Sequence, residues 1–343
     1  MSVDYRAAVE THGGIKQAAR ALGIPYATLH GRLSKLPELP ETREPIDDLL
    51  TRLRKNFERK HARRMAEHWL PLHIPEARAF GFVWFGDPHL GDDSCNLPLL
   101  EHHVSVCRKP GIYGGCVGDY SNNWVGRLLR KYADQETGKS SERELIKWFA
   151  KECGVDWRLW LIGNHDMWND GETIIGLIVD KAFYVASWEA RITLKSLTGE
   201  WRVHAAHSFP GHSLWNNNHG GLRAARMNSP AELFVAGHTH NYGLQSFEKP
   251  GDGRVANLVQ TRGYKWHDEY ATVKGYHQAQ SGASVMTVFN PEAKTVAGRI
   301  TSFGDVETGA DFLTFLRSQG SKVAVSNPRK PVRGKRSGKR SVR

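Results

Sequence analysis

Short apolar runs recur through the middle of the chain, and most of them end at a glycine or at a residue that can bind a metal ion. The clearest runs are residues 82–85, 160–162 and 233–236, together with Val203, Ala205 and Ala206 before His207. Apolar runs of this length predict buried strands. Because ligands bind at the carboxyl ends of strands in open α/β sheets, the residues after these runs are expected to gather at one rim.

The N-terminal region has a different spacing of apolar residues. Ala18, Ala19 and Leu22, followed after Gly23 by Leu29, predict two short amphipathic helices joined by a tight turn. Gly23 suits the left-handed position that ends a helix. After a proline-rich boundary near residues 37–45, residues 46–69 lack Gly and Pro and carry apolar residues at near-helical intervals among many basic ones, which predicts a basic helix.

Five polar segments supply candidate metal ligands. In chain order they are Asp87-Pro88-His89, Gly118-Asp119, Gly163-Asn164-His165-Asp166, His207 and Gly237-His238-Thr239-His240. Oxygen and imidazole ligands without a thiolate suit Mn²⁺, Fe or Zn²⁺, and two such ions about 3.5–4 Å apart form a clamp for in-line displacement at phosphorus. With 17 histidines in the chain any one segment can arise by chance, but five in this order predict a metal site.

These segments together resemble the calcineurin-like metallophosphoesterase superfamily, and the resemblance covers roughly residues 79–303. It implies an α/β fold, a four-layer sandwich of two mixed β-sheets flanked by helices. It also implies two divalent metal ions with a bridging hydroxide as the nucleophile. Mn²⁺ is the expected metal, and Fe or Zn²⁺ are the alternatives. The implied ligands are Asp119 as the bridge, Asp87, His89 and His240 for one ion, and Asn164, His207 and His238 for the other.

The resemblance further implies that His165 protonates the leaving oxygen and that Asp166 orients His165. The chain departs from the superfamily after Asp119, where residues 120–123 are Tyr-Ser-Asn-Asn instead of the usual x-x-Asp with a following Arg. This departure puts a phosphoprotein substrate in doubt. His204 and His212 compete with His207 for the isolated histidine ligand, and we choose His207 because it ends the strand-like run.

The N-terminal pattern resembles a Fis-type helix-turn-helix. By that resemblance the second helix, about residues 26–35, lies in the DNA major groove. The residues it would expose to DNA are Tyr26, Thr28, His30, Arg32 or Lys35. In the alternative interpretation, these helices dock on the catalytic domain or on another protein.

The net charge of +11 is concentrated near the C-terminus, where residues 327–343 hold eight Lys or Arg and no acid. Such a segment cannot bury enough surface to fold, so it is expected to be a disordered arm that binds polyanions or only aids solubility. A second group, between Arg262 and His277, interleaves basic with aromatic residues. It predicts either contacts with phosphates and nucleobases or ordinary strand packing.

The expected layout is a helix-turn-helix module at residues 1–36, a basic helical linker at 37–78, a phosphoesterase domain at 79–313 and a basic tail at 314–343. Four cysteines without Cys-x-x-Cys spacing are typical of a reduced, cytoplasmic protein. The chain has neither a charged-then-apolar leader nor an apolar run of roughly 20 residues, so no contact with a membrane is expected.

The predicted function is metal-dependent hydrolysis of phosphodiester bonds. The basic segments and the helix-turn-helix pattern favour a DNA phosphodiesterase or nuclease, with DNA as partner, and residues 87–91 resemble the first motif of SbcD-type nucleases. One alternative is an enzyme acting on a small phosphodiester or phosphomonoester, such as a cyclic nucleotide. Another is a DNA-binding regulator with a structural metal site, against which His165 argues because a structural site needs no acid.

Overall fold

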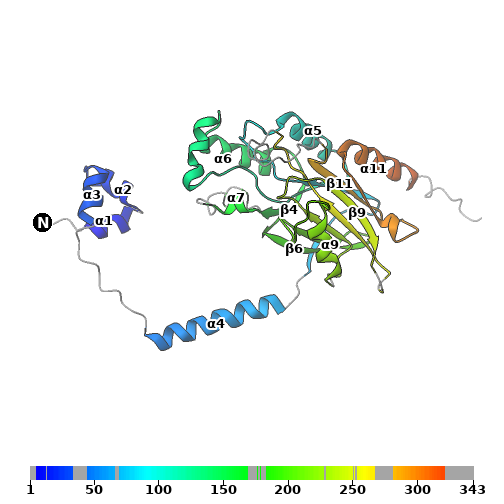
Figure 1. Ribbon diagram of the computed structural model, residues 1–343, viewed down its shortest axis with the longest axis horizontal. Helices are drawn as coiled ribbons and strands as arrows, with labels where there is room; N and C mark the ends of the chain where they lie inside the picture. The colour runs from blue at the N-terminus through cyan, green and yellow to red at the C-terminus, as the bar shows by residue number, and fades with distance from the viewer. Residues whose placement is uncertain are drawn as a thin grey trace, which may run out of the picture. The chain divides into compact units, whose positions relative to one another are not determined.

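The computed structural model describes most of the chain in two compact units, residues 1–67 and 68–343. The described residues are 5–12, 14–33, 45–65, 69–168, 176, 178, 183–227, 229–249, 251, 253–266 and 281–320. Lys35, the second half of the basic and aromatic group after residue 266, and residues 327–343 therefore lie outside the described residues. Figure 1 shows the elements and their labels.

The first unit is helical. Its elements are α1 (Tyr5–His12), α2 (Ile15–Ala21), α3 (Tyr26–Leu33) and α4 (Ile46–Met65). Ala18, Ala19 and Leu29 are buried in a small core formed by the first three helices. Gly23 has φ 64°, as expected for the residue that ends α2, and α1 is a third helix that the apolar spacing did not predict.

The second unit contains two six-stranded mixed sheets. The first has the order β1 (Leu70–His73), β6 (Glu189–Lys195), β7 (Glu200–Ala206), β8 (Leu233–Ala236), β10 (Val255–Gln260) and β9 (Gly243–Glu248). The second has the order β12 (Ile300–Phe303), β11 (Ser284–Phe289), β2 (Phe80–Phe85), β3 (Ile112–Cys116), β4 (Trp157–Ile162) and β5 (Tyr184–Ser187).

The two sheets pack face to face. Strand β2 is apolar throughout because both of its faces are buried. Phe82 and Trp84 point into the core between the sheets, where they join residues such as Trp201 of the opposite sheet. Val83 and Phe85 point to the other face and pack under the helices. A strand buried on both faces has no solvent-facing position, so the run shows no alternation with polar residues.

Helices cover the outer faces of both sheets. On the second sheet α11 (Val306–Gly320) lies against β11 and β2, beside α5 (Leu97–Cys107), whereas α9 (His219–Arg226) lies against β8 and β10 of the first sheet (Figure 1). The remaining elements are η1 (Gly126–Asp134), α6 (Lys139–Lys147), η2 (Trp148–Glu152), α7 (Asn164–Met167) and η3 (Ala297–Arg299). The fold is α/β, two mixed sheets flanked by helices, and this prediction is confirmed.

Two elements extend beyond the limits predicted for the phosphoesterase domain, residues 79–313. Strand β1 precedes residue 79 and pairs in parallel with β6, with Leu70 opposite Ile192. Helix α11 continues past Leu313 to Gly320 because Leu316 also packs against the core. A four-residue strand and the last turns of a helix carry too few apolar positions for sequence patterns to place them.

Two expectations about the class of protein can be compared with the described residues. All four cysteines, Cys95, Cys107, Cys116 and Cys153, have free thiols. In the described part of the chain, no helix has the length and apolar character needed to cross a bilayer.

Candidate metal centre

The five predicted segments lie at the carboxyl ends of strands. Asp87, Asp119 and Asn164 follow β2, β3 and β4, which are neighbouring parallel strands of the second sheet. His207 and His238 follow β7 and β8, which are neighbouring parallel strands of the first sheet. The two sheets therefore deliver their ligands to one shared rim, where parallel strands end together.

The backbone of this rim is strained. Seven non-glycine residues in the described part of the chain have positive φ, and five are candidate ligands: Asp87, His89, Asp119, His238 and His240, with φ between 30° and 70°. The other two are Asn123 and Trp188. Left-handed backbone at a non-glycine residue costs about 1–3 kcal/mol and clusters where function over-determines it. The strain marks five of the seven ligands that the motifs selected.

One group of donor atoms is centred on His207. Its Nδ1 lies 2.8 Å from the carbonyl oxygen of Val117, which can only accept, so Nδ1 carries the proton. The Nε2 atom then lies 3.0 Å from Asn164 Oδ1 and 3.3 Å from Asp119 Oδ2, which both accept. It also lies 3.1 Å from His238 Nδ1, which accepts in one tautomer of His238. Four donor atoms whose lone pairs converge fit a cation.

The charges around His207 agree with this geometry. Burial by itself lowers the pKa of His207, but the hydrogen bond and negative charge of Asp119 raise it to about 9. The pKa of His238 is lowered by burial and by His207. The cluster thus favours one positive charge where the donor atoms meet, and either a proton or a metal ion supplies it.

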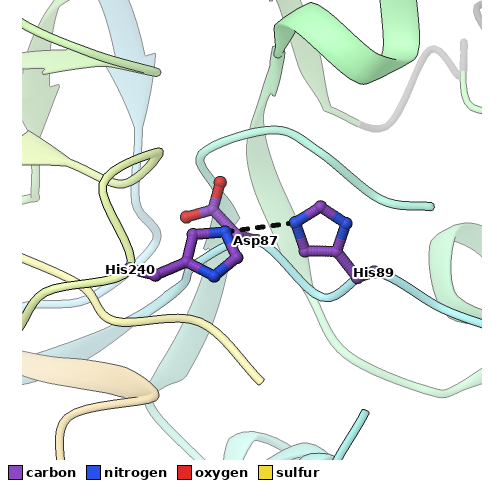
Figure 2. A group of neighbouring side chains, drawn as sticks. All are labelled: Asp87, His89 and His240. Carbon is purple, nitrogen blue, oxygen red and sulfur yellow. Dashed lines mark hydrogen bonds between the residues drawn. The ribbon is translucent and has the colours of Figure 1, made fainter. Parts of the chain in front are cut away.

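The second group contains Asp87, His89 and His240, whose side chains converge from the loops after β2 and β8 (Figure 2). The Nε2 atoms of His89 and His240 are 3.2 Å apart. Burial, followed by the charges of His240 and His165, lowers the pKa of His89 well below its ordinary value, so its ring is neutral. A neutral imidazole offers a lone pair to a metal ion.

Unpartnered polar atoms in this second group test whether a cation fits. Asp87 Oδ1 and His89 Nδ1 are buried and have no hydrogen-bond partner among the described residues. The other oxygen of Asp87 accepts from the backbone N–H of His238 at 2.8 Å. A buried polar atom without a partner costs about 1–3 kcal/mol, and a bound cation removes that cost at a carboxylate. The residues therefore fit the predicted metal.

Close approach explains two of the motif glycines. A Cβ at Gly163 would collide with the side chain and backbone nitrogen of Asp119, and one at Gly237 would collide with the carboxylate of Asp87. Only glycine lets these loops pass so near the ligands. Gly163 and Gly237 are thus part of the site's geometry.

His165 lies at the edge of both groups. Its backbone N–H donates to Asp119 Oδ1 at 2.9 Å, and its Nδ1 donates to the carbonyl oxygen of Asn122 at 2.7 Å. Its Nε2 lies 4.0 Å from Asp119 Oδ2, and its side chain is partly exposed. With Nδ1 held by a carbonyl, a second proton on Nε2 faces the ligands, which is the position an acid needs.

The contacts of Asp166 differ from the role that the resemblance implied. Its fully buried carboxylate accepts the backbone N–H groups of Gly163 and Asp119 at 2.8 Å and of Tyr120 at 2.9 Å. Burial, followed by the charge of Asp119, raises the pKa of Asp166 to about 7. Asp166 therefore joins two ligand loops, and the group that orients the His165 ring is the Asn122 carbonyl.

A polar network holds that carbonyl in place. Asn122 Nδ2 donates to Asp92 Oδ2 at 2.5 Å, and Lys265 Nζ lies 2.8 Å from the same oxygen. Although burial raises it, the charge and hydrogen bond of Lys265 lower the pKa of Asp92. Asn123 contributes from the next position, donating to the carbonyl oxygens of His165 and Trp168 at 2.8 Å each.

Other predicted residues lie away from the ligands. His204, the competitor of His207, packs edge-on against Phe209 and lies 3.4 Å from Glu189. In the basic and aromatic group, Arg262 and Tyr264 are buried, and the Tyr264 hydroxyl bonds to His103 and Ser284. Strand and loop packing explains these two residues, so the nucleobase-contact interpretation is wrong for them.

The predicted DNA-reading residues belong to the first unit and are exposed on α3. Thr28 and His30 are exposed, and Tyr26 is 47% exposed. Arg32 is exposed, but its Nη1 donates to the Tyr5 hydroxyl and its guanidinium lies 5.2 Å from the centre of the Tyr5 ring. DNA reading by α3 stays a prediction.

Sequence patterns missed Asn122 and Asp92, which hold the ring of His165 in place, and Trp188, which lies against His207. Lys265 belonged to the predicted basic and aromatic group, and the structure pairs it with Asp92. The positive φ of Trp188 is visible only in the folded backbone. A weak signal did exist for Asn122, because the departure from the superfamily falls on residues 120–123.

Comparison with known proteins gives similarity of structure without similarity of sequence. No protein-family model matches the chain, and no curated protein matches it significantly. Solved structures with a similar fold include an archaeal phosphodiesterase, at 11% identity over 65% of this chain and 99% of that one, with a TM-score of 0.35.

Two other solved structures are similar at the same level. A metallophosphoesterase from Sphaerobacter thermophilus is 12% identical over 72% of this chain and 98% of that one, with a TM-score of 0.33. Vacuolar protein sorting 29 from Cryptosporidium parvum is 14% identical over 62% and 86%, with a TM-score of 0.34. At these identities and scores the similarity is one of fold alone.

Proposed function

We propose that this protein hydrolyses phosphodiester bonds with two divalent metal ions, and that DNA is its substrate. The single observation that carries the hydrolytic part is the convergence at one rim of two ligand groups, Asp87, His89 and His240 beside Asp119, His207 and His238. Asn164 Oδ1 adds a seventh donor atom, 3.0 Å from His207 Nε2.

Metal ions held by these residues would neutralise charge on the phosphoryl oxygens and activate water as the nucleophile. The chain's own residues would do the rest. The two carboxylate oxygens of Asp119 make different contacts. Oδ1 accepts the backbone N–H of His165, and Oδ2 lies 3.3 Å from His207 Nε2. The backbone carbonyl of Asp119 also accepts the N–H of His89 at 3.1 Å, so Asp119 adjoins both groups. This place suits a bridging ligand, because a carboxylate lowers the repulsion between two cations.

His165 is the proposed proton donor. Its Nδ1–H is fixed on the Asn122 carbonyl, so the imidazolium form would present Nε2–H toward a phosphoester held by the ligands. When the phosphorus–oxygen bond breaks, the leaving oxygen takes this proton. A site that only bound metal for stability would not need a partly exposed imidazole held in this way.

The first unit supports DNA as the substrate. Thr28 and His30 stand exposed on α3, the helix that would enter the major groove, and Arg54, Lys55 and Arg59 are exposed on α4. The eight basic residues between 327 and 343 add positive charge in the sequence. These features would raise the local concentration of DNA near the metal rim.

The test uses the full chain after chelation and reloading with Mn²⁺, Fe²⁺ or Zn²⁺. Labelled single- and double-stranded DNA, bis(p-nitrophenyl) phosphate and p-nitrophenyl phosphate are compared as substrates at fixed salt. We expect metal-dependent cleavage of DNA and of the small diester. Turnover of the small diester with intact DNA would move the substrate to a small molecule, and turnover of the monoester alone would indicate a phosphatase.

Absence of turnover with every metal and substrate would contradict the hydrolytic proposal. A specific protein–DNA complex under those conditions would then favour a regulator with a structural metal site. Footprinting of that complex measures DNA binding independently of hydrolysis. It is carried out on the wild type and on Thr28→Ala.

A further inference from the structure

Trp188 shares the backbone strain of the metal ligands although it cannot bind a metal. Its φ is 66°, and the other six non-glycine residues with positive φ among those described are five candidate ligands and Asn123. For a bulky side chain this conformation is an outlier that persists only where surrounding structure enforces it. Position 188 is therefore held in place together with the site.

Hydrogen bonds on both sides of Trp188 show what enforces the strain. Its N–H donates to the carbonyl oxygen of Ile162, the last residue of β4, at 3.1 Å. Its carbonyl oxygen accepts from the N–H of His207 at 2.7 Å. Trp188 thus ties the end of the second sheet to a candidate ligand on the first, and its side chain has a fixed origin at the rim.

The indole ring lies against the ligands and remains open to solvent. Its centre is 5.1 Å from that of His207, at an interplanar angle of 75°, and 6.3 Å from that of His238. His207 is fully buried, whereas Trp188 is 38% exposed. Packing alone would favour burying so large an apolar ring, because tryptophan is usually largely buried.

Two other tryptophans lie near the proposed acid, and the nearer is Trp168, whose ring centre is 4.1 Å from that of His165. The second, Trp124, differs from Trp188 in its exposure. Its ring centre is 5.8 Å from that of His165, but the residue is only 8% exposed, and Lys131 and Lys265 lie near its ring. It has little surface to offer a substrate. Trp188 combines exposure with contact to a ligand.

We propose that Trp188 stacks on the nucleobase attached to the phosphoester that the metal ligands hold. The inference rests on the proposed function, and it defines the substrate as a nucleotide unit with its phosphate at the ligands and its base on the indole. Stacking on an aromatic ring tolerates any base sequence, since every base has a π-face. This subsite therefore selects for a base without selecting which base.

Binding of products tests this inference without relying on turnover. The full chain, loaded with Mn²⁺, is titrated by calorimetry with 2′-deoxyadenosine 5′-monophosphate and with 2-deoxyribose 5-phosphate, which lacks the base. We expect the wild type to bind the nucleotide about tenfold or more tightly than the sugar phosphate. In Trp188→Leu, which keeps an apolar cover over His207 but cannot stack, that ratio should fall close to one.

Tyr184 provides the matched control. It is also an aromatic residue and also 38% exposed, but it begins β5, at the opposite end of the strand from the rim. Four residues of strand separate the two positions by about 13 Å. Tyr184→Leu should leave the ratio at its wild-type value, and Trp188→Phe, which retains an aromatic face, should restore most of it.

Several results would overturn the inference. They are a wild-type ratio near one, binding of neither ligand, a ratio that survives Trp188→Leu, or equal weakening of both ligands in that variant. The last result would mean that Trp188 only supports His207. Hydrolysis of phosphodiesters by a chain with no base preference would refute this inference alone, whereas base-dependent binding without hydrolysis would refute the proposed function alone.

Discussion

The metal rim and the N-terminal helices both present polar residues at positions with a predicted function, but they hold them differently. At the rim Asp87 and His207 are fully buried, and the donor atoms of each ligand group converge within 4.8 Å. On α3, Thr28 and His30 face solvent. Burying a polar group is unfavourable without a partner, so burial at the rim demands an explanation, whereas exposure on α3 demands none.

This difference determines how far each functional prediction goes. The rim combines burial, backbone strain and unpartnered ligand atoms, and all three point to a cation. The helical unit exposes polar residues on α3, and exposure by itself requires no ligand. The predictions below test the two regions from the largest expected effect to the smallest.

The largest effect is expected from Asp119→Asn. The variant keeps the acceptor for the His165 N–H but removes the negative charge beside His207. Metal-dependent turnover should fall about a thousandfold, and the number of bound Mn²⁺ ions should fall from two to one. Turnover assays and metal analysis of the dialysed protein check this, with Asp311→Asn on the exposed face of α11 as control. Two bound ions and full turnover in Asp119→Asn would contradict the bridging role.

His165→Asn should lower turnover about a hundredfold without changing the number of bound metal ions. The loss should depend on the substrate, because an alcohol leaving group needs a proton and p-nitrophenolate hardly does. Rates on DNA and on bis(p-nitrophenyl) phosphate are therefore compared in the same preparation. His102→Asn, an exposed histidine of α5 beside Glu307, is the control. An equal loss on both substrates would argue that His165 acts on binding or folding instead.

Glu142 is a buried carboxylate outside the two ligand groups, and its effect is expected on stability. It is 1% exposed, and Tyr132 donates to it at 2.9 Å. Burial raises its pKa to about 7 from an ordinary 4.5, although the Tyr132 hydrogen bond opposes this. A raised folded-state pKa means that its contribution to stability is complete below pH 4.5 and is lost as the pH rises through 7.

Glu142→Gln removes the loss of stability at high pH, because glutamine does not ionise, and it keeps an acceptor for the Tyr132 hydroxyl. We expect the free energy of unfolding of the variant to exceed that of the wild type by about 1–3 kcal/mol at pH 8, with little difference at pH 4.5. Urea unfolding at the two pH values measures it. Glu144→Gln, whose side chain is exposed on the same helix, should show no such pH dependence. A difference that is constant with pH would contradict the explanation from burial.

The smallest effect is expected on α3. Thr28→Glu places a negative charge on the helix proposed to enter the groove and should weaken DNA binding a few-fold at low salt, with a smaller effect at high salt. Gln17→Glu adds the same charge at an exposed position on α2 and serves as the matched control. Fluorescence anisotropy with labelled duplex DNA measures both. Equal weakening by the two variants would indicate general electrostatics without a recognition helix.

Most of the rim was accessible from the sequence because its signals are local. Most of the candidate ligand segments follow an apolar run, and the strand ends of both sheets then place the ligands together. The choice of His207 over His204 also followed from its position at the end of a run, and the structure brings His207 to the ligands. Both sheets were predicted through the resemblance, but β1 and the last turns of α11 were too short or too polar to place.

The remaining features depend on contacts between distant segments. Asp166 has a side chain suited to orient a histidine, yet its oxygens accept backbone N–H groups, and a carbonyl of Asn122 holds His165 instead. Tyr264 is an aromatic residue of the kind that can stack on a nucleobase, but it is buried. Every residue has the same backbone N–H and carbonyl, so the sequence does not encode which of them will face a given side chain.

The sequence by itself therefore determined which residue types stand at the strand ends and in what order, because hydrophobic periodicity is a local property. Only the tertiary structure decided which donor atoms meet, which backbone is strained, and that Trp188 lies exposed beside His207. Those features arise from the packing of two sheets across one core, which joins residues far apart in the chain. Their geometry follows from long-range packing and not from the spacing of residues along the sequence.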